Sequence, residues 1–296
     1  MAWIDPVLAA VQPILVSGIV LASLYALMAT GLALVWNTLG IFNFAHGVFM
    51  TLAAYIAWQV ADARGLGLGL SIGIAVSISA MAGLGVIVNR LLISPFLGRK
   101  DIVLVAVMTT LAGAYFLENS ALLVWGPRIK QLDRVVTGNI KILGTAISLH
   151  ELVIVILAPL VLIALWAFLK WTRVGSAIRA VAQNQDSALL LGINVRAIYS
   201  LAFAISAALA GGAGVLLGAI RFITPTMGTE PLLKAFIVVI LGGLGSFIGT
   251  IVSAYLVGFL EAGSTYFIGA YWTQAALFGL FIIILVALPR GLMGRD

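Results

Sequence analysis

Apolar residues fill nearly all of this 296-residue chain in long uncharged runs, and polar residues gather in a few short interruptions. A helix that crosses the hydrocarbon core of a bilayer needs about 20 apolar residues, so each long run predicts a membrane span. The run at 6–61 is long enough for two spans. One further span is predicted in each of the segments 65–89, 102–125, 152–169, 197–220, 235–260 and 262–289. The pattern therefore predicts an all-α, polytopic integral membrane protein with about eight membrane segments.

Two of the apolar stretches are interrupted by glycine and small polar residues. The first break is 36–47, between the two spans of the first run, and the second break is 241–246. The second break divides 231–260 into two pieces, each too short to cross about 30 Å of hydrocarbon. This predicts half-helices that meet inside the membrane. The similar character of the two breaks suggests an internal repeat.

One polar insert stands between predicted spans, at 173–194. Its apolar and polar positions fall on separate stripes at helical spacing, so it is predicted to be amphipathic. The apolar stripe is Ile178, Val181, Ala182, Gln185 and Leu189, and the polar stripe is Arg179, Gln183 and Asp186. Asn184 or Asp186 is expected to cap a second short helix that Gly192 ends. Such an element either rests on the anionic lipid leaflet or docks a partner.

The composition supports membrane insertion and excludes several classes of protein. Apolar residues make up 63% and charged residues 9% of the chain, whereas a soluble domain carries roughly 25% charged residues. The absence of cysteine excludes disulfides and thiolate metal sites. The net charge of +6 comes from cations scattered between apolar stretches, which argues against nucleic-acid binding. The first residues lack the basic segment of a cleaved signal peptide, so the N-terminus is expected to be retained.

The cations predict the orientation, because cytoplasmic loops carry an excess of lysine and arginine. The groups at 90–100, 170–196 and 290–295 are assigned to the cytoplasmic side. The loop 126–150 then lies outside, although it holds four cations. Within this external loop, 135–142 is predicted to form a small β-hairpin with a Gly-Asn turn at Gly138 and Asn139. An ordered hairpin there would offer a binding surface to an external partner.

The residues of the two breaks are the candidates for a transport path. Non-helical backbone at membrane depth is tolerated only where it packs in protein or lines a wet cavity. The candidate path residues are Asn43, His46 and Gly47 in the first break and Gly242, Gly243 and Gly245 in the second. A helix N-terminus beside either break could face a substrate carboxylate. The alternative is structural: His46 is then a hydrogen-bonded packing residue, and the glycines permit close approach of helices.

Ionisable residues near the spans add little chemistry. Glu118 interrupts an apolar run and is a candidate proton-relay residue, but it is seven residues from Trp125 and so near the outer interface. Glu230 and Glu261 flank the second broken segment and are expected to be solvated interface charges.

Three stretches together resemble one family of transporters. The segments 40–47, 175–194 and 235–246 resemble the Liv-type permeases, the membrane subunits of branched-chain amino acid ABC importers. The likeness runs end to end and is nearest to the LivH-type half of the LivH–LivM pair. It implies a single transmembrane permease domain, 1–296, in the bacterial inner membrane. It also implies that 173–194 couples to an ATPase through the candidate residues Gly175, Arg179, Ala180, Asn184 and Gly192.

The resemblance further implies the partners: a second, LivM-like permease subunit, two cytoplasmic ATPase subunits, a periplasmic substrate-binding protein and membrane lipid. The chain has no G-x-x-x-x-G-K-[ST] loop, so ATP is expected to bind to partner subunits, and no cofactor of its own is expected. It is therefore expected to be a transport subunit and not an enzyme. The implied cargo is leucine, isoleucine or valine, moved by alternating access.

Other functions stay open at this level. Relatives within the family handle urea or short amides, so such a cargo is the nearest alternative. An ion-coupled secondary transporter would need an intramembrane charged pair or ion ligands, and the pattern offers only Glu118 and His46. An intramembrane enzyme would need a nucleophile–base pair or a metal cluster, and the chain has only two histidines, His46 and His150.

Overall fold

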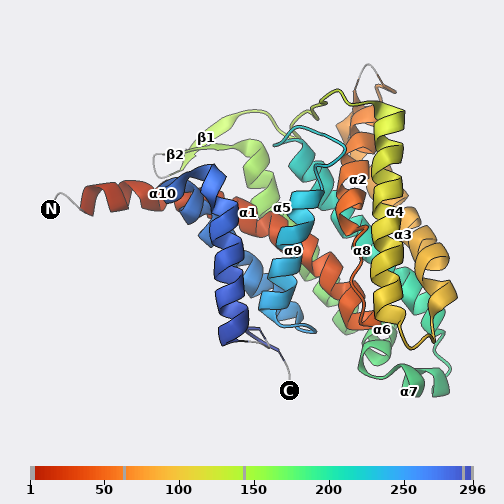
Figure 1. The fold of residues 1–296 in the computed structure, drawn as a ribbon. Coiled ribbons are helices and arrows are strands. Elements are labelled where there is room, and N and C mark those ends of the chain that lie inside the picture. The colour runs from red at the N-terminus through yellow and green to blue at the C-terminus, as the bar shows by residue number, and fades with distance from the viewer. Residues whose placement is uncertain (1–3, 63–64, 143–144, 289–290, 295–296) are drawn as a thin grey trace. The chain divides into compact units, whose positions relative to one another are not determined.

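The computed structural model describes residues 4–62, 65–142, 145–288 and 291–294, and Figure 1 shows its fold. These residues contain ten α-helices and one two-stranded sheet. The helices are α1 (Ile4–Leu39), α2 (His46–Ala61), α3 (Leu70–Val88), α4 (Ile102–Trp125), α5 (Leu149–Trp171), α6 (Arg173–Gln183), α7 (Gln185–Leu190), α8 (Val195–Gly218), α9 (Thr229–Gly242) and α10 (Phe247–Ala287). The strands are β1 (Asn139–Ile142) and β2 (Thr145–Ser148). Two short turns of other helix types, Asn89–Ile93 and Ser94–Phe96, follow α3.

The predicted membrane segments are confirmed as helices. In the described residues, six helical stretches are long and apolar enough to cross a bilayer, and they come from α1, α3 with the two turns after it, α4, α5, α8 and α10. The helices α2 and α9 are apolar but have only 16 and 14 residues. At about 1.5 Å per residue, both are shorter than a hydrocarbon core of about 30 Å. With these two short helices, the described part of the chain holds eight apolar helices, the number that its hydropathy predicts, although the last two differ in their bounds from the predicted 235–260 and 262–289.

The chain folds as two compact units. The first unit contains residues 1–29, 134–162 and 234–296, and the second contains residues 30–133 and 163–233. Each unit therefore combines segments that are far apart in the sequence. Neither the apolar runs nor the breaks predict this division.

In the second unit, α2, α3 and α8 pack closely together (Figure 1). Glycine allows two of these contacts. A Cβ atom on Gly214 of α8 would lie 2.2 Å from the Met50 carbonyl oxygen of α2, and one on Gly85 of α3 would lie 2.5 Å from the Phe203 carbonyl oxygen of α8. Lipid is as apolar as the helices, so close packing of this kind holds membrane helices together.

In the first unit, α9 ends at Gly242 and α10 begins at Phe247, so the break predicted at 241–246 is confirmed. The expectation that the second piece is a half-helix ending near 260, followed by a separate span from 262, is wrong, because the helix continues from Phe247 to the residues before Gly269. α10 is interrupted at Gly269, whose φ of 80° and ψ of 158° are not helical, and not at Glu261, where the charge divides the predicted spans. A positive φ is readily adopted by glycine and strained for other residues, so the interruption falls at a glycine.

The loop 126–150 contains a β-hairpin, but its register differs from the predicted one. β1 and β2 pair antiparallel, and Ile140 is opposite Ile147, which is buried. The connection between the strands is 143–144, which lies outside the described residues. Gly138 and Asn139, predicted as the turn, lie instead at the start of β1. Burial of the apolar face decides the register, and the local Gly-Asn signal does not.

Candidate coupling surface and transport path

The insert predicted at 173–194 forms two short helices joined by one extended residue. Thr172 caps α6, because its Oγ1 accepts a hydrogen bond from the Gly175 N–H at 2.9 Å. Asn184 is extended, with φ −158° and ψ 110°, and its Oδ1 accepts a hydrogen bond from the Ser187 N–H at 2.8 Å. Gly192 follows the end of α7 with a φ of 78°. The predicted second helix, its Asn184 cap and its end at Gly192 are confirmed.

A buried cluster seats α6 and α7 on the beginning of α8. Ile178, Val181 and Ala188 face inward and are 2%, 3% and 1% exposed. The other buried members of the cluster are Leu34, Val195, Ile198, Tyr199 and Ala202.

The predicted apolar stripe is wrong at three positions, because Ala182, Gln185 and Leu189 are exposed. For Gln185 and Leu189 the reason is the extended backbone of Asn184, which interrupts the helical period. Ala182 precedes this residue within α6 and is exposed although it lies one turn after the buried Ile178. The period restarts in α7, and the inward position of that helix is Ala188.

The outer face carries most of the predicted coupling residues. Arg179, Asn184 and Gly192 are exposed, and Ala180 is half-buried. Gly175 is buried instead, since a Cβ atom there would lie 2.3 Å from the Phe168 carbonyl oxygen. Gly175 therefore lets α6 approach the end of α5 and presents no surface to a partner.

The end of α7 forms an apolar tip, which consists of Leu189, Leu190 and Leu191. These side chains are 51%, 89% and 79% exposed. Three consecutive exposed leucines at the end of α7 and the exposed cation Arg179 on α6 supply apolar surface and a charge, both of which protein interfaces use. The surface of Arg179, Asn184 and this tip is the candidate coupling surface.

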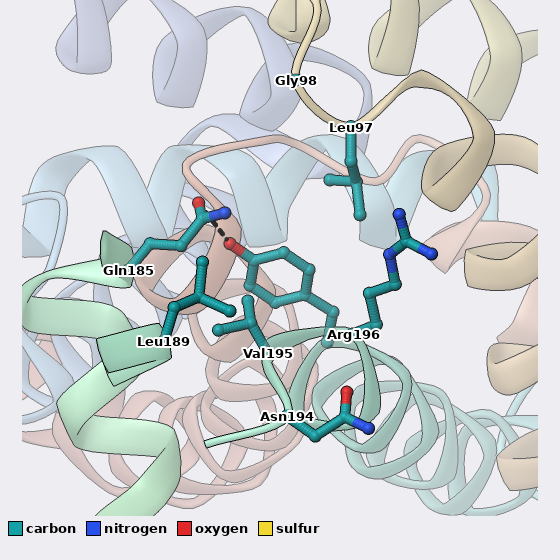
Figure 2. A pocket seen from close by; sticks show the side chains of 8 residues that line it. Leu97, Gly98, Gln185, Leu189, Asn194, Val195 and Arg196 are labelled. Atoms are coloured by element: carbon teal, nitrogen blue, oxygen red, sulfur yellow. Dashed lines mark hydrogen bonds between the residues drawn. The ribbon is translucent and has the colours of Figure 1, made fainter. Parts of the chain in front are cut away.

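A pocket of about 470 Å³ lies between α7 and the connection that follows α3 (Figure 2). One wall comes from Leu97 and Gly98, and the other comes from α7 and the start of α8. Tyr199 Oη donates a hydrogen bond to Gln185 Oε1 at 2.8 Å within it, as Figure 2 shows. The lining residues are Leu97, Gly98, Gln185, Leu189, Asn194, Val195, Arg196 and Tyr199. The cation-rich connections at 90–100 and 170–196 therefore meet at one end of the second unit, as their assignment to the same side requires.

The beginning of the loop 126–150 meets the other end of α8. Lys130 pairs with Ile223 through two backbone hydrogen bonds of 3.2 and 2.9 Å. The Lys130 ammonium also lies 4.1 Å from the ring centre of Trp58, near the end of α2. Because α8 has 24 residues, this contact is about 36 Å along the helix from the pocket. Lys130 of this loop is thus held by the Trp58 ring and by backbone hydrogen bonds to Ile223. It lies at the opposite end of α8 from the cation-rich connections.

The first break brings Asn43, His46 and Gly47 together in the second unit, and all three are buried. His46 Nδ1 lies 3.3 Å from Ser206 Oγ, and the Asn43 Oδ1 accepts a hydrogen bond from the Ala45 N–H at 3.0 Å. A Cβ atom on Gly47 would lie 2.7 Å from the Gly228 carbonyl oxygen. In this conformation the first break is a closely packed junction. The Asn43 Nδ2 has no hydrogen-bond partner within the described residues.

The second break lies in the first unit, and its three candidate glycines differ. Gly242 is buried, and a Cβ atom on it would lie 2.6 Å from the carbonyl carbon of Gly249. Gly243 is also buried and lies against the segment 291–294, whose Met293 N–H donates to the Gly242 carbonyl at 3.2 Å. Gly245 is exposed. The candidate path residues are therefore divided between the two units, three in each.

Sequence reasoning misplaced one charge. Glu261, expected to be a solvated interface charge, is 5% exposed and pairs with Lys234 of α9 at 2.6 Å. Glu230 is exposed as expected and pairs with Arg221 at 3.2 Å. Glu118 is half-buried on α4. The sequence offered one sign of this pair, because Lys234 directly precedes the apolar run 235–260. Its partner Glu261 is 27 residues away, and only the packing of the helices brings the two side chains together.

The described residues contain no group of three or more His, Cys, Asp or Glu side chains that could hold a metal ion.

Comparison with known proteins gives a consistent result. Residues 14–286 match the family described as "Branched-chain amino acid transport system / permease component". The high-affinity branched-chain amino acid transport system permease protein LivH of Escherichia coli K12 is 31% identical over 291 residues, 94% of each chain. The corresponding permease protein BraD of Pseudomonas aeruginosa is 32% identical over 293 residues, 95% of each chain. The ribose import permease protein RbsC of Escherichia coli K12 is 34% identical over 111 residues, 35% of each chain. No solved structure matches significantly.

Proposed function

The chain belongs to the family of permease components of branched-chain amino acid transport systems, and we propose that it is the membrane-spanning permease subunit of an ATP-driven importer of branched-chain amino acids. The observation that carries the proposal is similarity along nearly the whole chain to two permeases named for this transport. The eight apolar segments of the described residues support a multi-pass place in the membrane, which we assign to the bacterial inner membrane.

The proposed partners are a second permease subunit of LivM-like type, two cytoplasmic ATPase subunits and a periplasmic binding protein. The chain itself has no phosphate-binding loop, so the ATPase subunits bind and hydrolyse the ATP. Partners of this kind need a surface on the permease through which their movement reaches the membrane.

The coupling surface is suited to that transmission. α6 and α7 are anchored by Ile178, Val181 and Ala188 in the cluster at the beginning of α8. α8 in turn packs against α2 and α3. A push on Arg179 and the apolar tip would therefore move α6, α7 and α8 together, because a packed core transmits displacement and does not absorb it. This is how ATP-driven closure of the partners would produce alternating access.

The nearest alternative cargo is urea or a short amide. An ion-coupled secondary transporter is the other alternative, and the buried Lys234–Glu261 pair is a charged pair of the kind that it needs. The family match favours the ATP-driven importer.

Purification with the native neighbours in mild detergent, followed by uptake of leucine into vesicles, tests the proposed function. We expect ATP-hydrolysing subunits to co-purify and uptake to depend on ATP. Uptake that follows a proton or sodium gradient without ATP would contradict an ATP-driven importer. Uptake of urea and of a short amide is measured in parallel to decide the cargo.

The variant Arg179→Glu is expected to weaken attachment of the ATPase subunits by about tenfold or more, because it reverses an exposed charge on the coupling surface. Membrane insertion should be unaffected, since among the described residues the Arg179 side chain makes one exposed hydrogen bond, to Ser176. The ratio of ATPase subunit to permease after affinity purification measures the effect.

A matched control is Arg128→Glu, which makes the same charge change in the exposed part of the loop 126–150. It should leave the ratio of ATPase to permease unchanged. If Arg179→Glu assembles and transports like the wild type, the docking face lies elsewhere.

A further inference from the structure

Three side chains from three helices meet inside the first unit. Lys234 of α9 donates from Nζ to Glu261 Oε1 of α10 at 2.6 Å, and Tyr25 Oη of α1 donates to Glu261 Oε2 at 2.5 Å. Lys234 Nζ also lies 5.6 Å from the centre of the Tyr25 ring. Among the residues whose burial the structure describes, Lys234 and Glu261 are the only buried Lys, Arg, Asp or Glu side chains.

The three residues belong to a tightly packed contact within a candidate span. Glu261 lies inside the long helical stretch of α10 that precedes Gly269. A Cβ atom on Gly258 would lie 2.5 Å from the Ala22 backbone nitrogen, so α1 and α10 touch through their backbones. Tyr25 and Glu261 each follow these contact residues by three positions, about one helical turn. The close approach of the two helices therefore delivers the Tyr25 hydroxyl to the carboxylate.

Stability alone does not explain a buried ion pair of this kind. Removing two charges from water cancels much of their attraction, and apolar residues of similar volume often give equal or greater stability. An ionisable group inside a membrane span is therefore a candidate for function, together with its partner. One such function is to bind a charged solute while it crosses the membrane.

We propose that Lys234 and Glu261 bind the two charged groups of the amino acid during its passage, Lys234 the α-carboxylate and Glu261 the α-ammonium group. The proposal rests on the proposed function, because a free α-amino acid is a zwitterion at neutral pH. In the structure the two side chains pair with each other in the place of the ligand. When the ligand enters, one internal ion pair is exchanged for two ion pairs with the ligand. Each buried charge keeps a partner throughout.

The exchange selects ligands by charge. A ligand with a single charge would balance the charge of only one of Lys234 and Glu261, and a neutral urea or amide would balance neither. A site built to pair both charges rejects a ligand that lacks one of them, because the desolvated partner is then left unsatisfied. The pair therefore favours a zwitterion over the amide cargo that the sequence leaves open.

A further polar group lies on the same stripe of α10. Ser253, Val257 and Glu261 follow one another at intervals of four residues, and all three are buried. The Ser253 Oγ has no hydrogen-bond partner within the described residues. Buried hydroxyls are normally paired, so this one is available to a polar ligand on the helix face that carries Glu261. Tyr25 is a positioning residue, since its hydroxyl holds one carboxylate oxygen and leaves the other to Lys234 or to the ligand.

The test uses the complete transporter in proteoliposomes, with ATP, leucine and a saturating concentration of binding protein. The double variant Lys234→Met with Glu261→Gln removes both charges, so no unpaired charge remains and the complex is expected to assemble. The matched control is Arg221→Met with Glu230→Gln, which removes the exposed ion pair that reaches α9 one turn earlier. Assembly, ATP hydrolysis and leucine uptake are measured for each form.

We expect leucine uptake at least about tenfold lower in the double variant, with ATP hydrolysis stimulated by the loaded binding protein still within about twofold of wild type. The control should match the wild type in both. Unchanged uptake would overturn the proposal. So would failure of the double variant to assemble, because the pair would then be required by the fold itself.

Joint loss of uptake and ATP hydrolysis would also overturn it, because the pair would then act on the conformational cycle and not on the ligand. Absence of ATP-dependent uptake by the wild-type complex is a different result. It would contradict the proposed function, whatever the variants do.

Discussion

The variant Gly214→Ala is expected to destabilise the permease by about 1–3 kcal/mol, although alanine is the better helix former. The added Cβ atom would lie 2.2 Å from the Met50 carbonyl oxygen and 2.6 Å from the Met50 Cα. Both are backbone atoms, so α2 and α8 must separate to accept it. That separation also loosens contacts with α3, which packs against both helices. Thermal unfolding of the purified protein in detergent measures the loss.

The matched control is Gly212→Ala on the same helix. Its Cβ atom would lie 4.0 Å from Ile78 Cδ1, an ordinary contact. The same added methyl group is therefore expected to be neutral or to stabilise α8 by up to about 1 kcal/mol. If the two variants unfold at the same temperature, the close approach of α2 and α8 does not contribute to stability as inferred.

The variant Ile178→Asp is expected to abolish stable attachment of the ATPase subunits while the membrane helices still fold. Ile178 is 2% exposed in the cluster that seats α6 and α7 on α8. A carboxylate placed there has no ion partner in this cluster of apolar residues and tyrosine, and burying it costs several kcal/mol. The carboxylate reaches water at the lowest cost in free energy if α6 detaches from α8, and this detachment disrupts the coupling surface. Co-purification of the ATPase and proteolysis of the segment 173–194 measure the two effects.

Ala182→Asp is the control, because it adds the same charge at an exposed position of α6. It should keep α6 protected from protease. Ile178→Val keeps the site apolar and should cost only about 0.5–1.5 kcal/mol. Full ATPase attachment in Ile178→Asp would show that the seat of α6 is not what holds the coupling surface in place.

The membrane segments were predictable because they depend on local composition. The break at 241–246 was also predictable. Glycine adopts the positive φ that follows a helix end, as Gly243 does after α9. Serine caps the beginning of a helix, as Ser246 does for α10. The interruption of α10 at Gly269 was not predicted from the sequence. A single glycine in an apolar helix gives no signal unless its backbone angle is known.

The coupling segment shows the limit of periodicity. Asn184 was correctly predicted as a cap, and a cap on the second helix requires an extended residue that interrupts the period of the first. The stripe drawn through both helices ignored that consequence, so Gln185 and Leu189 were predicted to be buried and are exposed. In α6 itself, Ile178 and Val181 were predicted correctly, whereas Ala182 of the same helix is exposed.

The two breaks were recognised from glycine and polar residues, but the sequence did not show what each residue contacts. Gly47 packs against the backbone of Gly228, which is distant in the sequence, and Gly242 packs against the backbone of Gly249 across the break. Gly245 is exposed. That these residues line a transport path stays a prediction, and five of the six candidates are buried in this conformation.

The sequence by itself determined that this protein is a helical membrane protein, that its helices break near 36–47 and 241–246, and which family it resembles. Each of these follows from short stretches of residues, because hydrophobicity, capping and motifs are local properties. Only the tertiary structure decided that Glu261 is buried and paired with Lys234 and Tyr25, and that Ile178 anchors the coupling helices. Those pairings join residues up to 236 positions apart, and their energies depend on desolvation and contact, which exist only after the helices have packed.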